Sequence, residues 1–330
     1  MALSEEERFR FDLTGFLVRP AILNSDQIAA IVEHIDRIQH DPQSLSPAER
    51  DVPGGPSNVL IDHPQVVDVL RELIGPDIRL ENCTCLWREK GQRHGELHGG
   101  GPQQADPIFG YRVKNGRIHA GMVRVIFELT DIAMQDQSTH FLIGSHKAEF
   151  PVQEKHLSLE EGQRSPYLTS YECPAGSAVF FTENLCHAGP VWQRDTPRVA
   201  VLNAYSHLAT HWHRLKTPPA VINGLPREKQ AYFRQPWITD FHTNPVVHNT
   251  MERFIDGDDD PVSSEHITER RALYYSNNYI PSRHQLISKT GIATAATIPG
   301  EKILSPKNQD GPAAALPPAN TPNRRASPRG

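Results

Sequence analysis

The sequence predicts an all-β core preceded by helices, in the manner of a β-sandwich or jelly roll. The first observation is helical periodicity of apolar residues, which is confined to about the first 75 residues. The second is a change in the residue pattern from Ile78 onward, where short β-branched and aromatic runs are separated by Gly, Pro, Asn and Asp. Because the strands follow the helices and do not alternate with them, the pattern argues against a parallel α/β fold.

Two helices are expected after a short apolar strand around residues 15–17. The first helix has Asn24 or Ser25 as its N-cap, because either side chain accepts a hydrogen bond from a free backbone N–H. The second begins near Pro64, which suits a first helical turn, and ends at Gly75. The apolar residues that give each helix one buried face are Ile28, Ile31, Val32, Ile35, Ile38, Val66, Val67, Leu70, Leu73 and Ile74.

Four runs of residues are predicted to be strands of one all-β unit. They cover residues 78–87, 122–132, 177–181 and 198–206. Residues 40–58 are a polar, Pro/Gly-rich loop between the two helices. Residues 1–280 are assigned to one domain. Residues 281–330 contain few large apolar side chains and much Pro and Ala, so they are predicted to be a disordered tail.

Composition and charge argue against several classes of partner. A net charge of −5 indicates no basic stripe for nucleic acid, and the sequence has no apolar run of about 20 residues that would span a membrane. The acidic N-terminus lacks the basic start and apolar core of a signal peptide. Four cysteines in 330 residues make neither a disulfide scaffold nor a zinc ribbon. The expected setting is the cytoplasm and the expected partner is a small-molecule substrate, while the oligomeric state stays open.

A histidine-rich segment, residues 93–101, contains three potential metal ligands. If the segment is extended, His94, Glu96 and His98 point to the same side, because side chains alternate along a strand. The three glycines that follow let the backbone turn sharply. The simpler alternative is a polar loop with surface histidines, which is the commoner explanation of an isolated histidine.

A second feature combines His187 and Arg198. A hydrophobic strand delivers His187 to a turn, and the next predicted strand opens with Arg198. In antiparallel neighbours this spacing brings a guanidinium close to a metal bound by the histidine. Arginine suits a carboxylate because its planar fork donates two parallel hydrogen bonds. The alternative is an arginine that caps a hairpin at the surface.

Together these features resemble the phytanoyl-CoA dioxygenase family over about residues 9–240. The matching features, in chain order, are the Thr-Gly-Phe-Leu motif at 14–17, the Lys-Gly pair at 90–91 before His98, the Gly-Ser-His loop at 144–146, His187 and Arg198. Each motif alone is weakly specific, and their order and spacing carry the resemblance.

The resemblance implies a double-stranded β-helix, the jelly roll that cupins share. It also implies an Fe(II)- and 2-oxoglutarate-dependent dioxygenase that hydroxylates or oxidises a small molecule. In such a site two histidines and one carboxylate bind one face of Fe(II) and leave positions for 2-oxoglutarate and O₂. His98 and His187 match the family's histidines, and Arg198 matches the residue that binds 2-oxoglutarate.

The sequence departs from the family at the third metal ligand. The family motif is His-x-Asp, but Gly100 stands where the aspartate is expected after His98. Glu96 completes the predicted metal set with His98 and His187, in the reverse of the family's order; the alternative is that Glu96 pairs with His94 in the usual order. Glu183 and Asp106 are the other carboxylates that could replace the aspartate.

Alternative functions follow from the same departure. With no carboxylate at all, the open position would accept a halide, as in 2-oxoglutarate-dependent halogenases. With His94, Glu96, His98 and His187 together, the site would be a cupin-like set of three histidines and one glutamate without 2-oxoglutarate. A non-catalytic protein that keeps the barrel and has lost iron is the third alternative.

Overall fold

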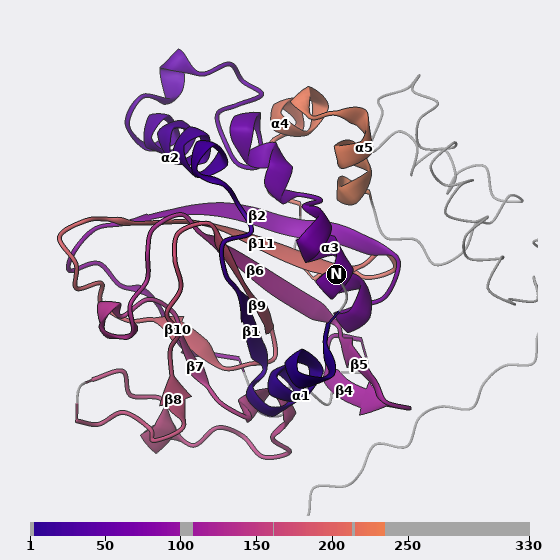
Figure 1. Ribbon diagram of the computed structural model, residues 1–330, viewed down its shortest axis with the longest axis vertical. Coiled ribbons are helices and arrows are strands. Elements are labelled where there is room, and N and C mark those ends of the chain that lie inside the picture. The colour runs from indigo at the N-terminus through magenta and orange to yellow at the C-terminus, as the bar shows by residue number, and fades with distance from the viewer. Residues whose placement is uncertain (1–2, 100–107, 161, 213–214, 235–330) are drawn as a thin grey trace, which may run out of the picture.

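The computed structural model describes residues 3–99, 108–160, 162–212 and 215–234, and two β-sheets form its centre (Figure 1). The larger sheet has five strands in the order β1-β9-β6-β11-β2. These are β1 (Phe16–Arg19), β2 (Ile78–Arg88), β6 (Met122–Glu128), β9 (Ser177–Thr182) and β11 (Arg198–His207). The smaller sheet has the order β3-β10-β7-β8. These are β3 (His94–His98), β7 (His140–Leu142), β8 (Leu168–Thr169) and β10 (His187–Gly189).

All paired strands are antiparallel, and the four predicted runs became β2, β6, β9 and β11 of the larger sheet. The expected all-β core with N-terminal helices, in its jelly-roll form, is therefore confirmed. A separate hairpin consists of β4 (Tyr111–Lys114) and β5 (Arg117–Ala120).

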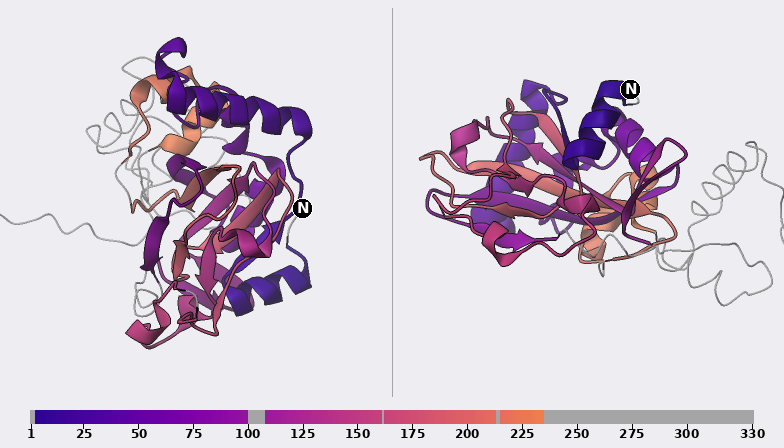
Figure 2. Two further views of the ribbon diagram at one scale, coloured as in Figure 1. Left: turned by 90° about the vertical axis from the view of Figure 1, so that its left-hand side faces the viewer. Right: turned by 90° about the horizontal axis from the view of Figure 1, so that it is seen from below.

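The helices lie outside the two sheets and not between them, as both views of Figure 2 show. They are α1 (Glu5–Thr14), α2 (Ser25–His40), α3 (Pro64–Leu73), α4 (Pro219–Gly224) and α5 (Arg227–Gln230). The two predicted helices are confirmed as α2 and α3. Asn24 is the N-cap of α2, since its side-chain oxygen accepts a hydrogen bond from the Gln27 N–H at 2.9 Å. Among the described residues no helix has the length and apolarity needed to cross a membrane.

Helix α1 was not predicted, although the sequence carries its start signal. Ser4 accepts a hydrogen bond from the backbone N–H of Glu7 at 3.1 Å, and the Glu7 carboxylate accepts one from the Ser4 N–H at 2.8 Å. This reciprocal capping box satisfies two backbone donors at the helix start. The helix ends at Thr14, and the capping residue Gly15 has a left-handed φ of +83°, which suits a residue without a side chain.

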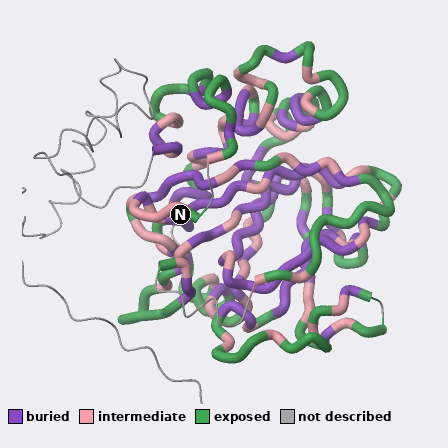
Figure 3. The backbone as a smooth tube through the Cα atoms, turned by 180° about the vertical axis from the view of Figure 1, so that it is seen from behind, coloured by how far each residue is buried: buried purple, intermediate pink, exposed green. Residues whose placement is uncertain are grey.

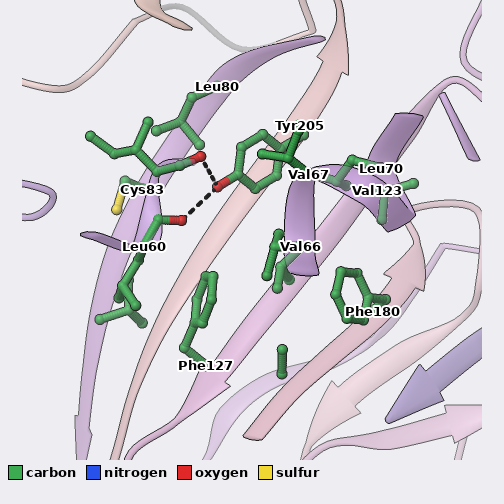
Figure 4. Close-up of a cluster of buried hydrophobic side chains, with 14 of the residues drawn as sticks. Leu60, Val66, Val67, Leu70, Leu80, Cys83, Val123, Phe127, Phe180 and Tyr205 are labelled. Atoms are coloured by element: carbon green, nitrogen blue, oxygen red, sulfur yellow. Dashed lines mark hydrogen bonds between the residues drawn. The ribbon is translucent and has the colours of Figure 1, made fainter. Parts of the chain in front are cut away.

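The outer face of the larger sheet packs against α2 and α3. On β6 the outward side chains are Val123, Val125 and Phe127, all completely buried in an apolar cluster that contains both helices. Tyr205 fixes the segment before α3 to this face, because its hydroxyl lies 3.0 Å from the Leu60 carbonyl and 2.9 Å from the next one (Figure 4). Figure 3 shows the buried residues concentrated along the strands and the exposed ones along the loops.

The inner face of the same sheet looks toward the smaller sheet and forms what we call the barrel interior. An apolar part of it contains Ile126, Phe141, Phe181 and Trp192. Charged side chains stand at other inward positions of the same strands: Arg88, Arg124, Glu128 and Arg198. Because side chains alternate along a strand, β6 supplies apolar residues outward and two charged residues inward.

Some sequence-based expectations fall outside the described residues. These are the predicted tail at residues 281–330, the end of the predicted domain at 235–280, Gly100 and Asp106. The four cysteines are all described and form no disulfide, as expected from their number and spacing.

Candidate metal centre

His98, Glu183 and His187 lie together where β3, β9 and β10 meet. His98 is the last residue of β3 and is the register partner of His187, the first residue of β10, and their rings are 4.2 Å apart between centroids. Glu183 follows directly after β9 in the turn that leads to β10. One potential ligand atom of each side chain lies within 4.8 Å of the others. Among the described residues, these three form a group that could hold a metal ion.

Backbone contacts fix the tautomer of both imidazoles. The Nδ1 of His98 lies 2.7 Å from the carbonyl oxygen of Glu96, and the Nδ1 of His187 lies 2.7 Å from that of Leu185. A carbonyl only accepts hydrogen bonds, so each Nδ1 carries the proton. Each Nε2 therefore presents a lone pair, and the hydrogen bond on the opposite nitrogen holds the ring in a metal-ligating orientation.

Burial keeps His187 neutral. Desolvation lowers the pKa of His187 to about 4, with the nearby Glu183 charge opposing the shift and His98 adding to it. A neutral imidazole is the form that binds a metal ion, so this ligand is ready at neutral pH without losing a proton. His98 differs because it is exposed at the rim of the barrel.

Arg124 holds the carboxylate of this group. From β6 its Nε donates to Glu183 Oε2, and its Nη2 donates to Oε1 at 3.1 Å. Burial alone would raise the pKa of Glu183, but the charge and hydrogen bonds of Arg124 bring it below the ordinary value. The carboxylate is therefore ionised and oriented, which a metal ligand requires.

Glu96 lies apart from this group. The register steps from His98 opposite His187 to His94 opposite Gly189, so two additional residues of β3 form a bulge. Gly95 within the bulge has a left-handed φ of +78°. The regular alternation expected for this segment is therefore broken, and the Glu96 side chain is 73% exposed and pairs with Arg93 at 2.6 Å.

His94, the remaining member of the predicted segment, also stays outside the group. It is exposed at the start of β3. The structure thus brings two of the predicted residues, His98 and His187, together with a carboxylate that the sequence offered only as an alternative.

Arg198, the predicted partner of 2-oxoglutarate, is buried in the barrel interior and already binds a carboxylate. Its Nε and Nη2 donate to the two oxygens of Glu128, at 3.1 Å for Nε and Oε2. Its Nη2 also lies 3.0 Å from the hydroxyls of Thr139 and Tyr171. The Tyr171 hydroxyl donates to Glu128 Oε1 at 2.5 Å. Both members of the ion pair are at most 1% exposed.

Arg88 is a second buried arginine beside this pair, directly opposite Arg198 in the register of β2 and β11. It is 2% exposed. Sequence reasoning missed Arg88 and Glu128, although a signal was present. Glu128 lies inside a predicted strand between Phe127 and Leu129, and Arg88 directly follows the predicted strand that ends at Trp87. A charge that such a strand buries is rare unless it is paired or functional.

Comparisons with known proteins establish the fold. No family model matches the sequence, and no curated protein matches it. Structures of HygX from Streptomyces hygroscopicus do match. The apo form is 23% identical with a TM-score of 0.54, and the match covers 65% of this chain and 91% of HygX. The form with nickel and 2-oxoglutarate bound is 22% identical with a TM-score of 0.54, covering 67% and 94%.

A third HygX structure, with nickel, 2-oxoglutarate and hygromycin B bound, is 24% identical. Its TM-score is 0.54, and the match covers 64% of this chain and 91% of HygX. At these identities the likeness is one of fold, and it agrees with the jelly-roll architecture described above.

Proposed function

We propose that this protein is a mononuclear non-haem iron enzyme that uses 2-oxoglutarate to oxidise a small molecule. The observation that carries the proposal is the group of His98, Glu183 and His187 with both Nε2 atoms free to bind. Two imidazoles and one carboxylate are the set that binds one face of Fe(II) in oxygenases. HygX, which has the same fold, was crystallised with iron and with nickel and 2-oxoglutarate, and this supports the choice of metal and co-substrate.

In this proposal His98, His187 and Glu183 hold the iron. Fe(II) and 2-oxoglutarate would supply the oxidising chemistry when bound. The chain positions them: backbone carbonyls fix the two imidazoles, and Arg124 orients the carboxylate. The buried apolar residues of the barrel interior, among them Phe141 and Phe181, exclude water from one side of the site.

Glu183 favours oxygenation over halogenation. A carboxylate within reach of both imidazoles takes the coordination position that a halide would need. The place of Glu183 in the sequence also differs from the family motif, because this carboxylate precedes the second histidine and does not follow the first. The nature of the substrate is left open by these residues.

Anaerobic addition of Fe(II) and 2-oxoglutarate tests the proposal. We expect about one iron per chain, a weak visible charge-transfer band and formation of succinate once O₂ is admitted. A protein that retains well under one iron per chain after reconstitution, or that forms no succinate, contradicts it.

A matched pair of variants tests the third ligand. Because losing even an outer partner of a metal ligand costs about 10- to 100-fold in affinity, Glu183→Gln should weaken Fe(II) binding at least about tenfold. Glu96→Gln removes a carboxylate from the same neighbourhood and should leave the affinity unchanged, because Glu96 faces solvent beside Arg93. The opposite ranking of the two variants in a metal titration would identify Glu96 as the ligand.

A further inference from the structure

A pocket lies between the start of α1, the end of α3 and the tip of the β4–β5 hairpin. Its volume is about 410 Å³, within the range of small-molecule sites. Figure 1 shows the hairpin beside α1, and the Tyr111 hydroxyl of β4 donates to the Asp12 carboxylate of α1 at 2.8 Å. None of the candidate metal ligands lines the pocket. The lining residues are Leu3, Arg8, Arg71, Glu72, Leu73, Gly116, Arg117 and Ile118.

The charges that line this pocket do not balance. Glu72 is its carboxylate, and both oxygens are used within the chain: Oε1 accepts from the Leu3 N–H and Oε2 from Arg8 Nε, each at 2.9 Å. Arg8 and Glu72 therefore neutralise each other. Arg71 and Arg117 take part in no hydrogen bond or ion pair within the part of the chain that the structure describes. The lining thus has two guanidinium groups without a counter-charge.

The hairpin is an independent indication that an anion belongs here. Its residues 111–120 contain four basic side chains and no Asp or Glu. In the register Lys114 lies opposite Arg117, and Arg112 lies opposite His119, so the basic side chains share one face. Like charges directly opposite each other destabilise a strand pair. A bound anion would remove this repulsion at the tip of the hairpin.

The rest of the lining is apolar and shapes the pocket for more than a bare ion. Leu3 and Leu73 are at most 3% exposed, and Ile118 packs against the same apolar cluster. Gly116 leaves the tip open, since a Cβ placed on it would meet no atom within 4 Å. The pocket therefore combines an apolar base with two arginines, which suits a ligand with an organic part and an anionic group.

We propose that this pocket binds a small phosphate monoester, with Arg71 and Arg117 on the phosphate and the apolar base against the organic part. Arginine matches phosphate because its planar fork donates two parallel hydrogen bonds to the oxygens. A phosphate monoester carries a charge of about −1.5 to −2 at neutral pH, which balances both guanidinium groups, whereas a monocarboxylate balances one. The site is separate from the candidate metal centre and does not depend on the proposed use of iron.

Calorimetric titration of the whole chain with phenyl phosphate, inorganic phosphate and benzoate at one ionic strength tests the proposal. Phenyl phosphate should bind saturably. We expect it to bind at least about tenfold more tightly than inorganic phosphate, because its ring covers the apolar base. Benzoate has the same ring but one negative charge, and it should also bind at least about tenfold more weakly.

Two register partners provide a matched pair of variants. Arg117→Gln and Lys114→Gln each remove one positive charge from the same exposed tip, but Arg117 lines the pocket and Lys114 does not. Arg117→Gln should weaken phenyl phosphate binding at least about fivefold, as expected for a hydrogen bond to a charged group, and Lys114→Gln less than about twofold. Neither variant changes a candidate metal ligand, so phosphate bound at a metal ion would not separate them.

Three results would overturn the proposal. The first is a wild type that does not bind phenyl phosphate saturably. The second is an equal loss in the Arg117 and Lys114 variants, which would indicate a general attraction of polyanions such as nucleic acid to the basic face of the hairpin. The third is benzoate or inorganic phosphate binding as tightly as phenyl phosphate, because the pocket would then not select an organic phosphate.

Discussion

The two faces of the larger sheet are made by the same strands but have different compositions. On β6 the outer residues Val123, Val125 and Phe127 pack under α2 and α3, while the inner residues include Arg124 and Glu128. The outer face therefore supplies apolar burial, the dominant stabilising contribution in folding. The inner face holds charges that cost free energy to bury and that make sense only as paired or ligand-binding groups. Because side chains alternate along a strand, the residues that stabilise the fold and the residues suited to bind ligands lie on opposite faces of the same sheet.

The largest expected effect is on the outer face. Phe127→Ala removes a completely buried ring from the cluster under the helices and should lower the free energy of unfolding by about 3–5 kcal/mol. Urea unfolding measures the loss, and metal titration serves as the control. If the two faces are independent, the Fe(II) affinity of the folded variant equals that of the wild type, and a large change in this affinity would break the comparison.

A pair of tyrosines compares the faces directly. The Tyr171 hydroxyl donates to the buried carboxylate of Glu128, whereas the Tyr205 hydroxyl on the outer face contacts neutral carbonyls. Tyr171→Phe should cost about 1.5–3 kcal/mol and Tyr205→Phe about 0.5–1.5 kcal/mol, because hydrogen bonds to charged groups are the stronger. Chemical denaturation of both variants checks the order. Equal losses would mean that Glu128 gains nothing from its charge at this contact.

A smaller effect on the free energy of unfolding is expected from pH, at a histidine that lies outside both faces of the sheet. His146 is completely buried beside α1, and burial lowers its pKa to about 4, although Asp12 opposes the shift. The unfolded chain, with an ordinary histidine pKa of about 6.5, binds the proton first on acidification. The contribution of neutral His146 to the free energy of unfolding is therefore fully present above pH 6.5, and it is lost as the pH falls toward 4.

At pH 5, protonation of His146 in the unfolded chain accounts for about 2 kcal/mol of the decrease in the free energy of unfolding. His146→Gln should reduce the decrease in unfolding free energy between pH 7 and pH 5 by this amount. His140 and His187, whose pKa values burial also lowers to about 4, contribute to the remaining decrease. Identical pH profiles for the variant and the wild type would show that His146 is not kept neutral by burial.

Local patterns were sufficient to predict most of the fold. Helices α2 and α3 followed from apolar spacing and from Asn24 and Pro64, and the central strands followed from their apolar runs. Helix α1 was missed because its apolar face is weak, although Ser4 and Glu7 form a capping box. The β4–β5 hairpin was missed as well, although Asn115-Gly116 is a typical two-residue turn and both residues have positive φ.

The candidate site was only partly predictable. His98 and His187 could be paired from their motifs, and the structure makes them register partners. The choice between Glu96 and Glu183 could not be made from spacing, because it depends on the bulge at Gly95, which turns Glu96 toward solvent. The partnership of Arg198 with Glu128 likewise depends on which side chains meet across the interior, and no local pattern encodes it.

The position of β3 gives metal binding a mechanical consequence. β3 is an edge strand of the smaller sheet and is mostly exposed, while β10, its partner, is buried. An ion bound by His98 and His187 would join the exposed edge strand β3 to the buried strand β10. The free energy of ion binding would then stabilise β3 against local unfolding. Amide hydrogen exchange of β3 would then slow on metal addition while the outer cluster stays unchanged. Slower amide exchange of β3 would thus show that the metal site is occupied, and the measurement needs no substrate.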